Sequence, residues 1–384
     1  MERSFEGFER PDGQVGIRNW VGIVSAMDNI NPVTRAVYSA VLGTIPITTL
    51  FVRGQYGVDG EVAYRTLAGL GRNPNLAAVL VVGLEPVTTN LIADRIRDSG
   101  KPVETVVVAE VGSVQATAVG TSIARRMVIE ASRLRRRPFP LARLTIGVEC
   151  GGSDTTSGIA ANPAIGHVSD RIVASGGSIV ISETSEFIGA EELFATQAVT
   201  PEVADEFLRR IRRLEAGSIA RGVDIRRVNP VPDNIRGGLT TLEEKSLGAM
   251  AKAGTSPLVS VLDYAERPSQ AGLHFMDTPA PAVESLTGLA AGGCQLILFA
   301  TGVGNPIGNT VAPTIKLSAN TRTLKMLADN LDFDASAVLE TGATVQAVGE
   351  DLLKFSLDIA SGTLTCCEVL GQQEIAVSRF EPSS

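Results

Sequence analysis

The segment at residues 77–84 constrains the fold of this chain more than any other. It reads AAVLVVGL, an uninterrupted run of apolar residues and glycine. A strand that faces solvent on one side alternates apolar and polar residues, whereas a strand covered on both faces of a parallel sheet does not. The run therefore predicts a central parallel strand whose sheet carries helices on both faces.

The segments around this run alternate between strand and helix patterns. Apolar runs at residues 21–26, 46–52 and 103–108 predict further strands, and helical patterns follow at 32–42, 87–98 and 113–135. Strands are predicted again at residues 144–150, 178–183, 258–264 and 295–300. This order predicts an α/β protein with doubly wound, mostly parallel sheets and flanking helices, arranged as two Rossmann-like units.

A charged, proline-containing stretch at residues 135–140, RRRPFP, is the best candidate for a link between these units. A chain of 384 residues also exceeds what a single core usually supports. We therefore expect an N-terminal α/β domain at residues 1–138 and a C-terminal catalytic α/β domain at residues 139–384.

Charge and cysteine usage exclude several classes of protein. A net charge of −8 argues against a nucleic-acid surface, and no apolar run is long enough to span a membrane. Four irregularly spaced cysteines do not form a disulfide framework, and neither a CxxC pair nor a histidine-rich tract indicates a stand-alone zinc site. A cytoplasmic globular protein is expected.

Several predicted strands run directly into small, polar turns. These turns lie at residues 25–29, 149–154, 182–184 and 301–305. In open α/β sheets, ligands bind just outside the carboxyl ends of the strands, where glycine allows close approach and helix N-termini favour anions. The pattern predicts a site for a small carboxylate or phosphate.

Six motifs resemble the altronate and galactarate dehydratases, a family that includes the large subunit of sulfolactate sulfo-lyase. The motifs are RPDG at 10–13 with GIRN at 16–19, CGGSD at 150–154 with SG at 157–158 and NP at 162–163, SET at 182–184 with GAE at 189–191, GGLTT at 237–241 with EKSLGA at 244–249, DTP at 277–279 with TG at 287–288, and PTIK at 313–316 with Asn320. The resemblance extends over almost the whole chain, from residue 8 to residue 371.

The resemblance implies a lyase for a small hydroxy acid. Such an enzyme removes the proton next to a carboxylate and expels a β-group, which is water for sugar acids and sulfite for sulfolactate. The resemblance also implies a divalent metal, Fe²⁺ in the family, and a small subunit with an SAF domain. This chain begins almost at the large-subunit motif, so we expect that subunit to be a separate polypeptide. We also expect a homo-oligomer.

The expected metal centre departs from the family pattern. Asn29 and Asn309 stand where the resemblance implies cysteines, and only Cys150 is kept. Amide oxygen suits Mg²⁺ or Mn²⁺ better than iron, or the site holds no metal. The predicted metal ligands are Cys150, Asp154, Asn29 and Asn309. Asp154 has the alternative role of capping the following helix.

Elimination requires a base, a group that stabilises the developing enediolate, and an acid for the departing group. The predicted catalytic residues are Lys316, Glu183, Lys245 and His274. Lys316 is expected on a helix after Pro313, as base or carboxylate ligand. Lys245 lies near a helix start, where a cation gains nothing from the helix dipole, so a carboxylate partner or substrate is expected.

The predicted substrate-binding residues come from the polar turns: Gly151, Gly152, Ser153, Asn162, Thr240, Thr241, Gly302 and Asn305. Other polar residues favour structural roles. Glu186 is expected to complete a capping box, and His167 and Arg18 are expected to be structural.

The leading hypothesis is a lyase that eliminates water from a small hydroxy acid. One alternative keeps the fold and eliminates sulfite, or epimerises a hydroxy acid through the same carbanion. The other is a non-catalytic subunit that binds an acid or serves as a scaffold for its partner.

Overall fold

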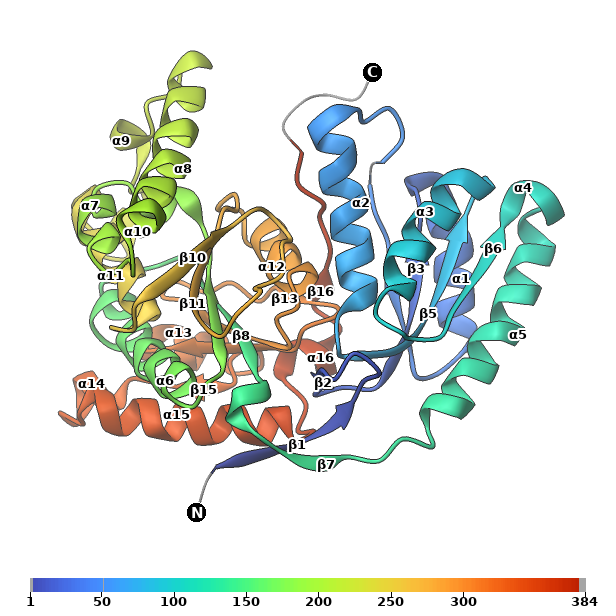
Figure 1. Ribbon diagram of the computed structural model, residues 1–384. Helices are drawn as coiled ribbons and strands as arrows, with labels where there is room; N and C mark the ends of the chain where they lie inside the picture. Colours follow the sequence, from blue (N-terminus) through green and yellow to red (C-terminus); the bar gives the residue numbers. More distant parts are fainter. Residues whose placement is uncertain (1–2, 51, 380–384) are drawn as a thin grey trace.

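The computed structural model describes residues 3–50 and 52–379 and confirms an α/β fold with mostly parallel sheets (Figure 1). The smaller of its two large sheets is parallel, with strand order β4-β3-β5-β6. Its strands are β3 (Trp20–Ser25), β4 (Thr44–Ile47), β5 (Leu76–Gly83) and β6 (Val103–Val107). Every residue of β5 is buried, as the apolar run predicts.

Helices cover both faces of this sheet. Helices α1 (Asn31–Ala40) and α5 (Ser113–Ala131) contact each other. Helices α2 (Gly57–Arg72) and α3 (Pro86–Arg97) form the second contacting pair. The sequence pattern does not predict α2, because four of its residues are glycines. At Gly69 a Cβ atom would collide with the backbone of Ala291, so glycine allows α2 to pack closely against the second unit.

The larger sheet has seven parallel strands in the order β10-β11-β9-β8-β12-β14-β15. They are β8 (Thr145–Cys150), β9 (Ser178–Ile181), β10 (Leu258–Leu262), β11 (Gly272–Met276), β12 (Leu296–Ala300), β14 (Thr314–Ser318) and β15 (Phe333–Asp334). Helices α6 (Asn162–Ala174) and α15 (Val345–Ala360) pack together against one face, and α12 (Ala282–Ala291) covers the other. The α12 face shares one continuous hydrophobic core with the smaller sheet.

Two segments expected to be irregular are ordered elements. Residues 135–140, predicted to be a link, contain strand β7 (Arg137–Pro140), which pairs antiparallel with β1 (Ser4–Glu9). Residues 229–238, whose proline, asparagine and glycine content favours a loop, contain the short helix α10 (Pro232–Arg236). The division of the chain at residue 138 stays a prediction.

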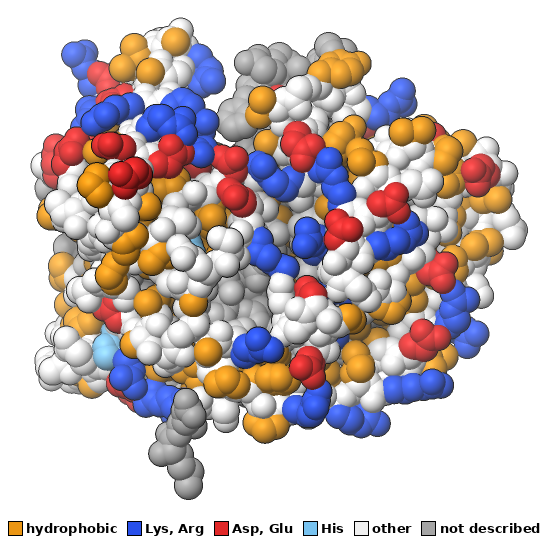
Figure 2. Space-filling model, in the orientation of Figure 1, with side chains coloured by type: hydrophobic (Ala, Val, Ile, Leu, Met, Phe, Trp, Pro, Cys, Tyr) orange, Lys and Arg blue, Asp and Glu red, His pale blue; other side chains and the backbone are white. Residues whose placement is uncertain are grey.

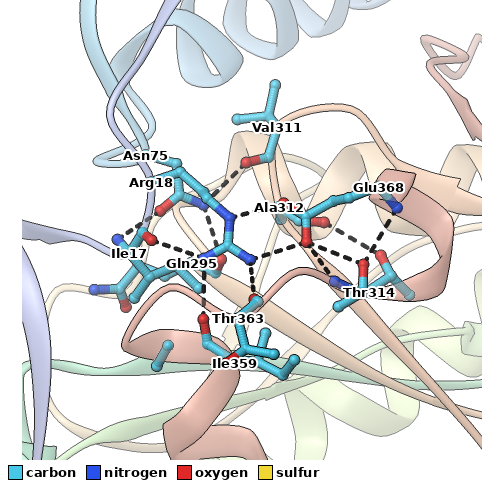
Figure 3. A network of polar contacts seen from close by, with 12 residues as sticks. Ile17, Arg18, Asn75, Gln295, Val311, Ala312, Thr314, Ile359, Thr363 and Glu368 are labelled. Carbon is cyan, nitrogen blue, oxygen red and sulfur yellow. Dashed lines mark hydrogen bonds and ion pairs between the residues drawn. The ribbon is translucent and has the colours of Figure 1, made fainter. Parts of the chain in front are cut away.

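A buried polar network ties the first sequence motif to the last part of the chain (Figure 3). Arg18 forms an ion pair with Glu368 at 2.7 Å and donates to the carbonyl oxygens of Ile359 and Thr363. Asn75 accepts from the backbone of Ile17 and donates to two carbonyl oxygens of the second unit. Arg18 therefore has the structural role expected for it.

In the part of the chain that the structure describes, no helix combines the length and apolar character that a membrane span requires.

Candidate active site

Two adjacent strands of the larger sheet bring Cys150 and Glu183 together. Cys150 is the last residue of β8, and Glu183 follows the neighbouring strand β9. Glu183 has a φ of 70°, in the left-handed region that non-glycine residues rarely occupy. Its backbone N–H donates to Thr278 Oγ1 at 2.8 Å, and its carboxylate accepts from the Cys150 N–H at 3.1 Å. Strain of this kind is found most often at functional sites.

These two residues belong to a buried cluster of five ionisable side chains. One ligand atom each of Cys150, Glu183 and Glu186 lies within 4.8 Å of the other two. Lys252 Nζ lies 3.0 Å from Cys150 Sγ and 2.8 Å from Glu183 Oε2. Lys245 Nζ lies 2.9 Å from Glu186 Oε1. The cluster therefore consists of one thiol, two carboxylates and two ammonium groups.

The two lysines come from one short helical segment. Lys245 lies in α11 (Leu242–Met250), and Lys252 lies in the 3₁₀ turn η5 (Ala251–Ala253) that follows. The carboxylate partner expected for Lys245 is thus Glu186. The capping role expected for Glu186 is wrong, because its carboxylate points into the cluster and pairs with Lys245 instead.

Burial and charge set the protonation of this cluster. Burial raises the pKa of the Cys150 thiol to about 12, against the opposing effect of Lys252. Burial by itself lowers the pKa of Lys252, but Cys150, Glu183 and Glu186 outweigh it and raise that pKa well above its ordinary value. Burial thus favours the neutral form of Cys150, and the carboxylates of Glu183 and Glu186 favour the charged form of Lys252.

A second buried row of side chains crosses three neighbouring strands. Glu149, Phe299 and Lys316 are register partners on β8, β12 and β14. Lys316 Nζ lies 3.0 Å from the centre of the Phe299 ring and donates to the Ile307 carbonyl oxygen at 3.1 Å. Burial lowers the pKa of Lys316 and raises that of Glu149, each well away from its ordinary value. The prediction that Lys316 lies on a helix is wrong, since Pro313 precedes strand β14.

Hydroxyl groups connect this row to the cluster. Glu149 Oε2 accepts from Ser182 and from Ser285, each at 2.7 Å, whereas Oε1 has no partner among the described residues. Ser285 Oγ also accepts from Thr278 Oγ1 at 3.2 Å, and Thr278 in turn anchors the Glu183 backbone. The Glu149 row and the cluster therefore form one continuous polar network.

His274 lies elsewhere in the sheet. It is on β11 with Nδ1 2.8 Å from Ser260 Oγ, and its Nε2 is buried without a hydrogen-bond partner among the described residues. Burial lowers the pKa of His274 to about 4. In the part of the chain that the structure describes, it makes no hydrogen bond to the cluster, so its catalytic role stays a prediction.

Three predicted metal ligands are engaged in local turns. Asp154 accepts from the backbone of Ser157 and from Asn320, which matches its alternative role as a cap. Asn309 accepts from the backbone of Val311 and Ala312, and Asn29 is exposed. Among the described residues none of the three hydrogen-bonds to Cys150, which is grouped with Glu183 and Glu186 instead. Their assignment as metal ligands stays a prediction.

The predicted substrate-binding residues lie in the turns after β8 and β12, before α11, and at the start of α6. The turn at Gly152 is bonded to the turn at Gly302, and Gly302 lies so close to Asp154 that a Cβ atom would collide with it. Thr240 and Thr241 are exposed and bond to Glu244 at the start of α11. The others contact neighbouring turns or helices: Gly151, Ser153, Asn162 and Asn305. Asn162 Oδ1 is buried and has no partner among the described residues, which leaves it available to a ligand.

A cleft of about 500 Å³ is lined by Thr278, the residue that accepts from the Glu183 N–H, but by none of the five cluster side chains. Its walls are α2, α8 (Pro201–Ala220) and residues 378–379. In Figure 1 the last described residues run beside α2, and Figure 2 shows basic and acidic side chains crowded over α8 and α9 (Ile225–Val228). Arg213 and Arg221 of α8 line the cleft together with the acidic Asp277 and Glu284, and Arg213 is paired with Asp277.

The sequence did not predict Lys252 or Glu149 as site residues. The motif at residues 244–249 ends just before Lys252, and a lysine between two alanines carries no distinctive pattern. Glu149 immediately precedes the motif at 150–154 and is the one acidic residue of a buried strand. A charge within an otherwise apolar strand is a signal that could have identified it.

The fold is that of an α/β protein with a buried candidate site at the carboxyl ends of parallel strands. Residues 141–383 match the family model for the C-terminal part of D-galactarate/altronate dehydratase, and residues 7–132 match the second domain of D-galactarate dehydratase/altronate hydrolase. The chain belongs to the D-galactarate/altronate dehydratase family, and the prediction of a lyase related to these dehydratases is confirmed.

Three characterised relatives are similar over most of the chain. It is 40% identical to the (2R)-sulfolactate sulfo-lyase subunit beta of Chromohalobacter salexigens, over 100% of this chain and 99% of the relative. It is 33% identical to altronate dehydratase of Bacillus subtilis, over 98% of this chain and 77% of the relative. It is 32% identical to the L-threo-forming galactarate dehydratase of Escherichia coli, over 94% and 73% respectively.

Proposed function

We propose that this chain eliminates a β-group from a small 2-hydroxy acid and releases a 2-oxo acid. The observation that carries the proposal is the cluster of Cys150, Glu183, Glu186, Lys245 and Lys252, which is connected through Thr278 to a cleft. Two ammonium groups and two carboxylates at one strand end supply the cations and the base that such an elimination needs.

The reaction breaks the C–H bond next to the carboxylate and the bond from the β-carbon to the leaving group. The electron pair of the C–H bond forms the double bond of an enol, which tautomerises to the 2-oxo acid. In this proposal Glu183 accepts the proton, Lys252 stabilises the negative charge that develops on the enediolate, and Lys245 holds the substrate carboxylate. Burial raises the pKa of Glu149 well above its ordinary value, which favours the protonated form needed to donate a proton to the departing group.

Water is the leaving group in the first form of this proposal. Sulfite is the second candidate, because the chain matches the sulfo-lyase subunit beta over nearly the full length of both proteins. Both candidates use the same proton abstraction and differ only at the β-carbon. The name of that relative also supports a separate partner subunit for this chain, for which we propose an SAF domain, within a homo-oligomer.

A divalent metal belongs to the family expectation, and its fit can be judged from the donor atoms. The thiol of Cys150 and the carboxylates of Glu183 and Glu186 are close enough to share one cation. Each of these three side chains, however, already contacts a lysine. Cys150 and Glu183 contact Lys252, and Glu186 contacts Lys245. No step of the proposed reaction is therefore assigned to a metal.

The experiment is a panel of altronate, galactarate and sulfolactate, assayed with the chain alone and co-expressed with the product of the adjacent gene. Formation of 2-oxo acid from at least one of them is expected, and parallel detection of sulfite separates the two leaving groups. Cys150→Ser is expected to lower the rate at least ~10-fold, by analogy with the loss of a residue that orients a reacting group. Cys294→Ser is the matched control, because that thiol is equally buried and lies outside the cluster. Absence of 2-oxo acid from every acid would contradict the proposal.

A further inference from the structure

We propose that the ammonium group of Lys252 is the built-in cation of the Cys150–Glu183–Glu186 group and occupies the position that a divalent metal would take there. Lys252 would occupy this position whichever acid is the substrate.

The position of Lys252 is the first observation. Its Nζ contacts Cys150 Sγ at 3.0 Å and Glu183 Oε2 at 2.8 Å, and its side chain is fully buried. These are the donor atoms that would define a mixed sulfur and oxygen metal site. The ammonium group thus bridges the same two atoms that a metal ion would bridge.

Charge matching is the second observation. Glu183 pairs with Lys252 and Glu186 pairs with Lys245, at 2.8 and 2.9 Å. Each carboxylate of the group therefore has its own ammonium partner. A divalent ion loses hydration free energy when it leaves water. A group with no excess negative charge does not offset that loss.

Bond lengths make the two cations mutually exclusive. A divalent ion bound to Glu183 Oε2 through a bond of about 2.1 Å would lie no farther than about 5 Å from the ammonium group. Three positive charges would then face each other in a buried site of low dielectric constant, where repulsion is strong. Either Lys252 or the metal must leave.

The backbone holds Lys252 in place. Ser169 Oγ of α6 donates to the Lys252 carbonyl oxygen at 2.8 Å. Gly166 of the same helix approaches the preceding residue, Ala251, so closely that a Cβ atom would collide with it. A segment held at Lys252 and at the residue before it does not move easily for an incoming ion, so we expect the lysine to stay.

The test uses Co²⁺, whose thiolate complexes absorb strongly in the near ultraviolet. The anaerobically purified chain, alone and with its co-expressed partner, is titrated with Co²⁺ and followed by absorption and equilibrium dialysis. We expect no thiolate-to-cobalt band from the unmodified protein. Lys252→Ala is expected to produce the band and to bind Co²⁺ at least about 100-fold more tightly, because one competing charge is removed.

Three further variants locate the signal. Lys245→Ala keeps the Lys252 ammonium group, so it should show no band. Lys252→Ala combined with Cys150→Ser should lose the band, which assigns it to that thiolate. Lys252→Arg keeps a cation in the site and should behave as the unmodified protein, and it serves as the informative variant if Lys252→Ala does not fold.

The result that overturns the inference needs no change at Lys252. Stoichiometric metal in the purified protein that is lost in Cys150→Ser and kept in Cys294→Ser would show that the group binds metal with Lys252 present. A cobalt band from Lys252→Arg would also contradict it. Failure to form a 2-oxo acid would count against the proposed function and leave these metal measurements unaffected.

Discussion

Two polar turns, each at the carboxyl end of a strand, have different structural outcomes in this molecule. After β3 the chain continues into Asp28 and Asn29, and both side chains are exposed. After β8 it continues from Cys150 into a turn whose ionisable neighbours are buried. Both strands lie inside their sheets. The difference is that α11 and the turns beside it pack around the end of β8 and contribute Lys245 and Lys252. A polar strand end thus forms a site where other elements enclose it.

The sharpest test of this comparison is Lys252→Met, with the largest expected effect. Removing one partner from a buried ion pair leaves Glu183 without its cation, which costs roughly 3–5 kcal/mol of unfolding free energy. Urea unfolding measures this loss, and Lys354→Met, an exposed lysine, is the control with a change within ~0.5 kcal/mol. Equal midpoints for the two variants would mean that the cluster does not stabilise the fold.

The sequence predicted the four strands of the smaller sheet and β8, β9, β10 and β12 of the larger one, because burial on two faces leaves continuous apolar runs, but it missed β11, β14 and β15. It predicted a carboxylate partner for Lys245 because a cation near a helix N-terminus needs one. It could not place Lys252 beside Cys150, because that contact joins residues 102 positions apart and depends on how α11 docks. Lys316 was assigned to a helix because a short strand after Pro313 has too few residues to show a period of two.

The same sheet provides a pH test at His274. Its folded pKa of about 4 lies below the ordinary value of 6.5, so the unfolded chain binds the proton more readily. The full stability is therefore present above pH 6.5 and is lost as the pH falls toward 4, by at most about 1.4 kcal/mol per pH unit. Urea midpoints of the unmodified protein and of His274→Gln should diverge across this window. Parallel curves would show that the imidazole reaches water.

Asp154 tests whether the residues of the β8 turn serve structure or ligand binding. Its carboxylate accepts from Ser157 and from Asn320 while buried, so Asp154→Ala should cost about 1–3 kcal/mol. Asp154→Asn keeps part of this bonding and should cost less. Thermal unfolding measures the loss of stability. The metal content of the purified variants tests the alternative that Asp154 is a metal ligand. Loss of bound metal in a variant that remains folded would restore the sequence-based assignment of Asp154 as a ligand.

The smallest expected effect is at Asn29, and it decides whether the two strand ends differ in function. The side chain is exposed, so Asn29→Ala should change the unfolding free energy by no more than ~0.5 kcal/mol. We expect the rate of 2-oxo acid formation to stay within about two-fold, since an exposed side chain with no contact to the cluster adds little to transition-state binding. Cys150→Ser, measured in the same assay, provides the contrast. A loss in Asn29→Ala as large as that in Cys150→Ser, with the fold intact, would mean that the β3 turn reaches the substrate from across the cleft. The end of β3 would then belong to the same active site as the end of β8.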